Sequence, residues 1–80
     1  MVTSAQIRAA RGLLNWTVRD LAEKSGVHRN TVTRVETDAT EPGHSIAAIR
    51  AALESAGVIF LEDGRSVDGG PGVRLAKPKA

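Results

Sequence analysis

The first 57 residues of the chain show the apolar spacing of amphipathic helices, with hydrophobic side chains three or four positions apart. Capping-box pairs that begin at Thr3 and Thr17 predict two helix starts, and Ser45 has the position of a further N-cap. Gly26 and Gly57 are typical of helix ends. The pattern therefore predicts four helices, over about 4–15, 18–25, 29–37 and 46–56, with a loop over 37–44.

Beyond residue 57 the pattern changes to that of short β-strands. Residues 58–61 are β-branched, aromatic or aliphatic, and residues 73–75 alternate apolar and charged side chains. A glycine-rich segment between the two strands predicts a loop. We therefore expect a mostly α fold that ends in a short two-stranded β element over 58–76 and a tail over 77–80.

Two of the predicted helices carry a charged residue within the apolar stripe. Arg11 takes the place four residues after Ile7 in the first helix. Glu36 takes the place four residues after Val32 in the third helix. Because a charge directed toward a core is tolerated when it is paired, the opposite signs predict an Arg11–Glu36 ion pair that joins these two helices.

Composition narrows the possible functions. The chain has 80 residues, 41% of them hydrophobic, and its aromatic residues are Trp16 and Phe60, so we expect a small core of aliphatic side chains between helices. The absence of cysteine excludes a disulfide scaffold and a thiolate zinc site, and the two histidines lie far apart. We expect no metal, cofactor, small-molecule ligand or enzyme activity. Without a membrane span or a signal-peptide pattern, we expect a cytoplasmic protein.

The formal net charge of +2 is unevenly distributed along the chain. Residues 1–35 carry six basic and two acidic side chains, whereas residues 36–80 carry five basic and seven acidic ones. The N-terminal part is therefore the candidate surface for an anionic partner.

Two short helices that are separated by a turn at Gly26 have the sequence form of a helix-turn-helix. In such a unit the first helix supports the second, whose far face stays free to enter a groove. Val32 and Val35 supply the inward face of the second helix. The side chains that then face outward are Asn30, Thr33, Arg34 and Thr37, with Arg29 and Thr31 on the flanks. Arg, Asn and Thr are residue types that contact base edges in the major groove of DNA.

Further residues around this unit have the chemistry for binding DNA phosphates. Thr17 heads the second predicted helix and His28 takes the N-cap position of the third, where helix amides attract phosphate. The residues predicted to contact phosphate are Thr17, Arg19, Thr31, Lys24 and Arg8. His28 is predicted to be either a phosphate neighbour or a base contact.

Residues 7–36 resemble the phage-repressor and Cro-like (XRE-class) helix-turn-helix family, and the fourth predicted helix extends the likeness to about Ala56. The positions that carry the resemblance are Arg11, Leu21-Ala22, Gly26, Val32 and Val35-Glu36. The resemblance implies a lambda-repressor-like domain of four helices over 1–57 that binds double-stranded DNA.

The same resemblance implies roles for individual side chains. In the family, the start of the recognition helix contacts bases, and the cap of the preceding helix contacts phosphate, which here implies Thr17. The family also pairs an arginine in the first helix with a glutamate at the end of the third, in agreement with Arg11 and Glu36. The base contacts that the resemblance implies are His28, Arg29, Asn30, Thr33 and Arg34.

The chain departs from the family pattern after the recognition helix. The loop there carries Asp38 and Glu41 instead of basic residues, which disfavours a DNA contact from that loop. A strand pair takes the place of the fifth helix that packs many family members into dimers. The first strand has two possible partners, residues 73–75 of the same chain or the same strand of a second copy. The residues of this possible dimer strand are Val58, Ile59, Phe60 and Leu61.

We therefore expect a small transcription regulator that occupies a pseudo-palindromic operator as a homodimer, with its two recognition helices ~34 Å apart. The alternative is a protein-interaction module of the antitoxin or anti-regulator type. In that alternative the C-terminal strands bind another protein and DNA binding is secondary.

Overall fold

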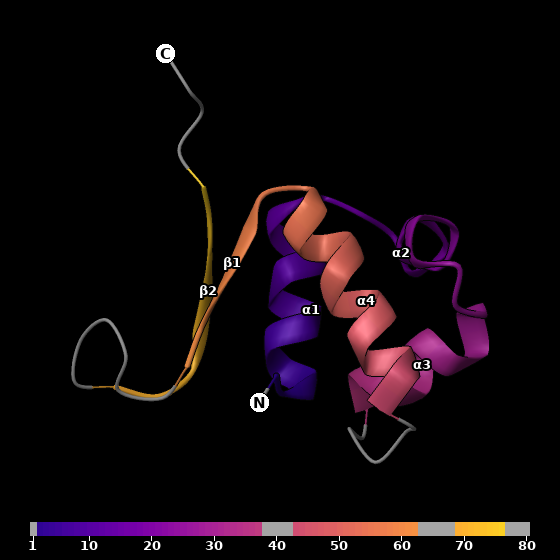
Figure 1. Cartoon of the computed structure of the whole chain (residues 1–80), viewed down its shortest axis with the longest axis horizontal. Coiled ribbons are helices and arrows are strands. Elements are labelled where there is room, and N and C mark those ends of the chain that lie inside the picture. Colours follow the sequence, from indigo (N-terminus) through magenta and orange to yellow (C-terminus); the bar gives the residue numbers. More distant parts are fainter. Residues whose placement is uncertain (1, 38–42, 63–68, 77–80) are drawn as a thin grey trace.

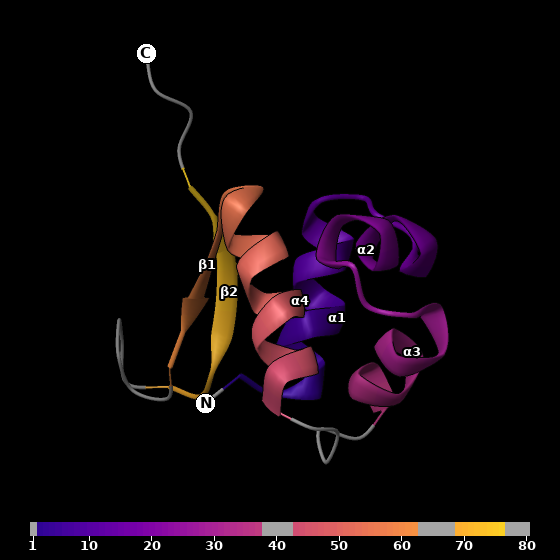
Figure 2. The same ribbon diagram turned by 45° about the vertical axis from the view of Figure 1, so that its right-hand side comes forward.

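The chain folds into helices and one small sheet within residues 2–37, 43–62 and 69–76, which are the residues that the computed structural model describes. The elements in this part are α1 (Ser4–Leu13), α2 (Val18–Ser25), α3 (Arg29–Thr37), α4 (Gly43–Ser55), β1 (Val58–Leu61) and β2 (Gly72–Leu75). Figures 1 and 2 show the two strands at one side of the molecule and α2 and α3 at the other, with α1 and α4 between them. The predicted mostly α fold with a C-terminal β element is confirmed. Within the described residues, no helix has the length and apolar character that crossing a membrane requires.

The start of α1 is the predicted capping box, but the helix ends earlier than predicted. The Thr3 hydroxyl accepts a hydrogen bond from the Gln6 backbone amide at 3.1 Å, and the Gln6 side chain accepts one from the Thr3 amide at 2.8 Å. The helix ends at Leu13 because Asn15 adopts a left-handed φ of 56° and the Trp16 amide donates to the Arg11 carbonyl at 3.0 Å. This is a Schellman ending with asparagine in the place where glycine is more common.

The start of α4 differs from the sequence prediction. The helix begins at Gly43, and Ser45 is its third residue, buried at 8% exposure. Because an N-cap residue lies outside the helical backbone and keeps its side chain over the first amides, Ser45 is not the N-cap that the pattern predicts. A buried serine in the first turn and a capping serine have the same local sequence, so the pattern could not separate them.

Three predicted loop or tail segments lie partly or wholly outside the described residues. Of the predicted 37–44 loop, Thr37 belongs to α3, and Gly43 and His44 belong to α4. The segments outside the described residues are 38–42 in that loop, 63–68 between the strands and 77–80 in the predicted tail.

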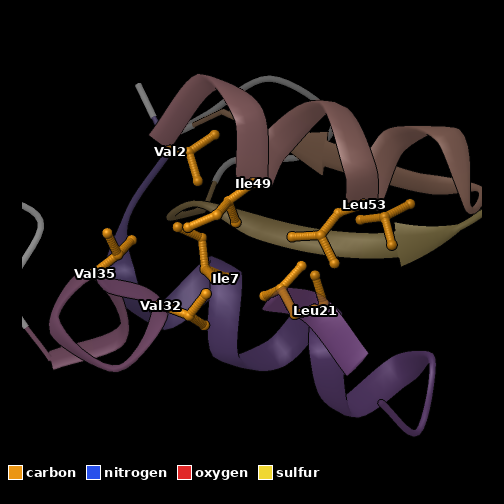
Figure 3. Close-up of a cluster of buried hydrophobic side chains, with 9 residues drawn as sticks. Val2, Ile7, Leu21, Val32, Val35, Ile49 and Leu53 are labelled. Carbon is orange, nitrogen blue, oxygen red and sulfur yellow. The ribbon is translucent and has the colours of Figure 1, made fainter. Parts of the chain in front are cut away.

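The hydrophobic core of the described residues lies between α4 and the first three helices (Figure 3). Its buried side chains are Val2, Ile7, Ala10, Leu21, Val32, Val35, Ile49, Leu53 and Val58. Val32 and Val35 are completely buried, as predicted for the inward face of α3. Full burial of an aliphatic side chain contributes ~1.5–3 kcal/mol, so these two valines fix which face of α3 is turned outward.

Arg11 and Glu36 form the ion pair that the sequence predicts. The Arg11 Nε lies 2.8 Å from Glu36 Oε2, and Nη2 lies 3.0 Å from Oε1, so the pair is bidentate. The third guanidinium nitrogen of Arg11 donates to the Trp16 carbonyl at 3.0 Å. The hydrogen bond to Glu36 raises the pKa of Arg11 against the opposing effect of burial, so the guanidinium stays charged wherever the protein is folded. One side chain thus joins α1, the connection to α2, and α3.

The tight turn between α2 and α3 depends on a left-handed glycine. Gly26 has a φ of 72°, and its amide donates to the Ala22 carbonyl at 2.9 Å. A Cβ on Gly26 would meet no atom within 4 Å. The predicted end of α2 is therefore confirmed, and glycine is required there by the backbone conformation and not by crowding.

β1 and β2 pair within the chain as an antiparallel hairpin, with Phe60 opposite Val73. Of the two alternatives for β1, the structure shows the partner in the same chain. The Gln6 amide of α1 donates to the carbonyls of Leu61 at 3.0 Å and Gly72 at 2.9 Å. Gln6 is only 4% exposed, and the capping-box pattern that marks it in the sequence does not predict its contact with the strands. This buried amide and the core residue Val58 fasten the hairpin to the helices.

Replacing Arg11 with methionine is expected to lower the free energy of unfolding by about 3 kcal/mol, because the Glu36 carboxylate would stay buried without its partner. Urea unfolding followed by circular dichroism measures this change. Arg19→Met is the matched control, since the Arg19–Glu23 pair is exposed and should contribute less than about 0.5 kcal/mol. Equal stability of the two variants would show that the Arg11 pair does not hold the fold.

Replacing Gly26 with alanine is expected to lower the melting temperature by about 4–8 °C, since a left-handed alanine costs ~1 kcal/mol. Gly12→Ala is the control with the opposite sign. Gly12 lies within α1 at an ordinary φ and also has free space around its Cβ position, so alanine there should stabilise by about 0.5 kcal/mol. Thermal unfolding of both variants checks the difference, and a Gly26→Ala variant as stable as the parent would contradict it.

Candidate nucleic-acid interface

The outward face of α3 is a row of exposed polar and basic side chains. Behind it, Val32 and Val35 are buried, and the acidic residue of α3, Glu36, is buried and paired with Arg11. The structure thus brings together at this surface all five predicted base contacts, and the acidic side chain of the same helix is turned away from them. The exposed residues are His28, Arg29, Asn30, Thr33, Arg34 and Thr37, with Thr31 half-buried at the flank.

His28 caps the N-terminus of α3. Its Nδ1 accepts a hydrogen bond from the Asn30 amide at 3.1 Å, and its carbonyl accepts one from Val32 at 3.0 Å. In the neutral imidazole an accepting Nδ1 requires the proton on Nε2, which is then a donor on an exposed ring. The same histidine therefore ends the turn and presents a hydrogen-bond donor beside the start of α3.

Two of the threonines of α3, Thr33 and Thr37, use their hydroxyl protons within the helix. Thr33 donates to the Arg29 carbonyl at 3.1 Å, and Thr37 donates to the Thr33 carbonyl at 2.9 Å. Each oxygen can still accept a bond and each methyl group stays available for apolar contact. In contrast, the side chains of Arg29, Asn30 and Arg34 make no hydrogen bond within the described residues.

The N-terminus of α2 presents the second group of predicted contacts. The Thr17 hydroxyl accepts from the Asp20 amide at 3.0 Å, and the Asp20 carboxylate accepts from the Thr17 amide at 2.9 Å. Arg19 lies 3.6 Å from Glu23 in a pair whose side chains are 76% and 68% exposed. Such an exposed pair is weak, so the Arg19 guanidinium can exchange Glu23 for a phosphate at little cost.

Two of the predicted phosphate contacts lie apart from this group. Lys24 borders an open groove between α2 and α4 that is also lined by Trp16 and by small side chains of α4. Arg8 lies at the C-terminal end of α3, where its guanidinium donates to the Glu36 carbonyl. In the free protein, one of these two cations therefore borders the groove between α2 and α4, and the other contacts the backbone at the C-terminal end of α3.

Ser4 is a residue that sequence reasoning missed. Its hydroxyl donates to the Val35 carbonyl at 2.6 Å, across from α1 to the last turn of α3. Ser4, Arg8 and Arg11 are four and three residues apart, which places them on one face of α1. That spacing, together with the predicted ion pair of Arg11, was the available signal for this contact.

Comparison with known proteins supports the geometry of this surface. The helix-turn-helix family HTH_3 matches residues 7–48, which is more than half of the chain and includes α2, α3 and the turn between them. No curated protein matches the chain. The left-handed turn at Gly26 and the exposed face of α3 agree with this family match. The chain therefore belongs to the XRE-type, Cro/C1-like helix-turn-helix family of DNA-binding transcription regulators.

Proposed function

We propose that the protein regulates transcription by binding a pseudo-palindromic operator, with α3 in the major groove. The observation that carries this proposal is the contrast between the two faces of α3. One face is buried in the core through Val32 and Val35, and the other exposes Arg29, Asn30 and Arg34, whose side chains have no hydrogen-bond partner among the described residues. Polar side chains on a fixed helix are suited to directional hydrogen bonds with base edges.

Each exposed residue type of α3 suits a different base. Asn30 can form paired hydrogen bonds with adenine, and Arg29 and Arg34 can donate twice to guanine. Thr33 can contact the methyl group of thymine through its own methyl group, which stays exposed while the hydroxyl donates to the Arg29 carbonyl. The Nε2 proton of His28 can be donated to a base edge or to a neighbouring phosphate.

Phosphate contacts come from α2 and the flank of α3. Thr17 at the head of α2 and Arg19 in its first turn lie at the positive end of the helix dipole, and Thr31 flanks α3. Lys24 adds attraction that is independent of sequence. Because this set of cations is small, we expect modest affinity for non-specific DNA and a strong dependence on base contacts.

We further propose that two copies bind the operator together through β1. All four β1 residues are apolar, Ile59 is 42% exposed, and within the described residues only one edge of β1 is paired. The free edge of β2 is protected differently, since Arg74 lies in the strand and Pro71 directly precedes it. A second copy is the partner we infer for β1, because a pseudo-palindromic operator is matched by a protein dimer with two-fold symmetry.

Replacing Asn30 with alanine is expected to weaken binding to cognate duplexes by ~1–3 kcal/mol and to relax the preference at one base position. Arg19→Ala is expected to weaken binding to all DNA alike and to lower the slope of log K against log salt by ~0.9. Selection of bound sequences followed by titrations at several salt concentrations measures both effects. If neither substitution alters DNA binding, the protein-partner alternative of an antitoxin or anti-regulator is favoured instead.

Replacing Ile59 with lysine is expected to convert the dimer to a folded monomer, since the side chain is exposed within one chain and would be covered in the dimer. Leu13→Lys is the matched control, because Leu13 is equally exposed at 43% but lies on α1. Phe60 is less suitable, as its ring packs against the core and beneath Arg50. Analytical sedimentation at high micromolar protein concentration measures the oligomeric state. A monomeric parent protein, or an Ile59→Lys variant that stays dimeric, would contradict pairing through β1.

A further inference from the structure

The last turn of α3 is held by three side chains of α1. Ser4 donates to the Val35 carbonyl at 2.6 Å, and Arg8 donates to the Glu36 carbonyl. Arg11 binds the Glu36 carboxylate through two nitrogens. Both the backbone and the side chain of Glu36 are therefore fixed by residues of a different helix.

These contacts satisfy groups that a helix leaves without partners. The last four carbonyls of a helix lack intrahelical donors, and in α3 they include those of Val35 and Glu36. They also form the negative end of the helix dipole, where a guanidinium is stabilised by ~0.3–1 kcal/mol. Ser4 and Arg8 thus cap α3 from outside, at the end opposite to the cap that His28 provides.

From this arrangement we propose that Ser4 and Arg8 are positioning residues for DNA recognition, and that Arg8 is not a phosphate contact. The proposal depends on the proposed function of α3 as the helix that contacts bases. A nine-residue helix that is held at its N-terminal turn and by two valines can pivot about them. Ser4 and Arg8 hold the backbone of the C-terminal turn beside the Arg11–Glu36 pair, and contacts at both ends fix the direction of the exposed face. Hydrogen bonds to base edges weaken when the donor–hydrogen–acceptor angle departs from linearity, whereas the electrostatic attraction to phosphates depends little on direction.

The position of Arg8 is also unfavourable for a phosphate. Its guanidinium lies against the carbonyl end of α3, where the helix dipole repels an anion. Thr17 and His28, by contrast, lie at the amide ends of α2 and α3, where the dipole attracts one. The charge of Arg8 is therefore used to hold α3 and not to bind DNA.

The test compares specific and non-specific binding in four variants, using a selected cognate duplex and a scrambled duplex at several salt concentrations. Arg8→Met is expected to lower cognate affinity about tenfold, which corresponds to 1.4 kcal/mol, without changing scrambled-duplex affinity or the salt slope. Arg8→Lys keeps a donor and a charge and should restore most of the cognate affinity. Ser4→Ala should lower cognate affinity about threefold, and Arg19→Ala should weaken both duplexes and the salt slope.

A second measurement follows the hydrogen bonds themselves. In the DNA-free protein, Arg8→Met should shift the carbonyl ¹³C resonance of Glu36, and Ser4→Ala should shift that of Val35, while Arg19→Ala should shift neither. These shifts report the hydrogen bonds from Ser4 and Arg8 to α3 even if the protein binds no DNA. Failure of the proposed function is seen separately, as an unsubstituted protein that binds neither duplex. If Arg8→Met lowers the affinity for both duplexes equally and reduces the salt slope, the proposal is overturned in favour of a phosphate contact. Unchanged cognate binding in both Arg8→Met and Ser4→Ala would overturn it as well.

Discussion

The bidentate ion pair between Arg11 and Glu36 is the interaction on which the arrangement of this protein depends. Removing two charges from water is unfavourable unless each finds its partner in good geometry, and here the carboxylate is almost fully enclosed. Arg11 meets that requirement and also binds the Trp16 carbonyl, so the pair fixes α1 relative to both α3 and the connection that leads to α2. The orientation of the exposed face of α3 follows from this pair and from the two valines behind it.

The two proposed functional surfaces lie at opposite sides of the same core. α2 and α3 form one side and the hairpin forms the other, with α1 between them in contact with both (Figure 2). Through Gln6, α1 holds the carbonyls of the hairpin, and through Ser4 and Arg8 it holds those of α3. α1 thus fixes the position of the surface proposed to bind DNA relative to the strand proposed to pair two copies.

Local signals predicted much of this structure, and contacts between distant segments account for the rest. The capping boxes at Thr3 and Thr17 and the left-handed Gly26 were predictable because each acts within a few residues. The Arg11–Glu36 pair was predictable because a charge in an apolar stripe requires a partner. The burial of Ser45 was not predictable, since a serine has the same local pattern whether it caps, packs or donates to another helix. The spacing of Ser4 from Arg11 indicated that Ser4 faces α3, but not which atom its hydroxyl binds.

The central claim, that α3 contacts bases in the major groove, is tested most directly by dimethyl sulfate protection of a duplex selected by the protein. The reagent methylates guanine at N7, which faces the major groove, and adenine at N3, which faces the minor groove. Binding through α3 in the major groove should protect guanine N7 positions in two clusters about one helical turn apart. Protection confined to adenine N3, or no protection of any base in a duplex that the protein binds, would contradict it.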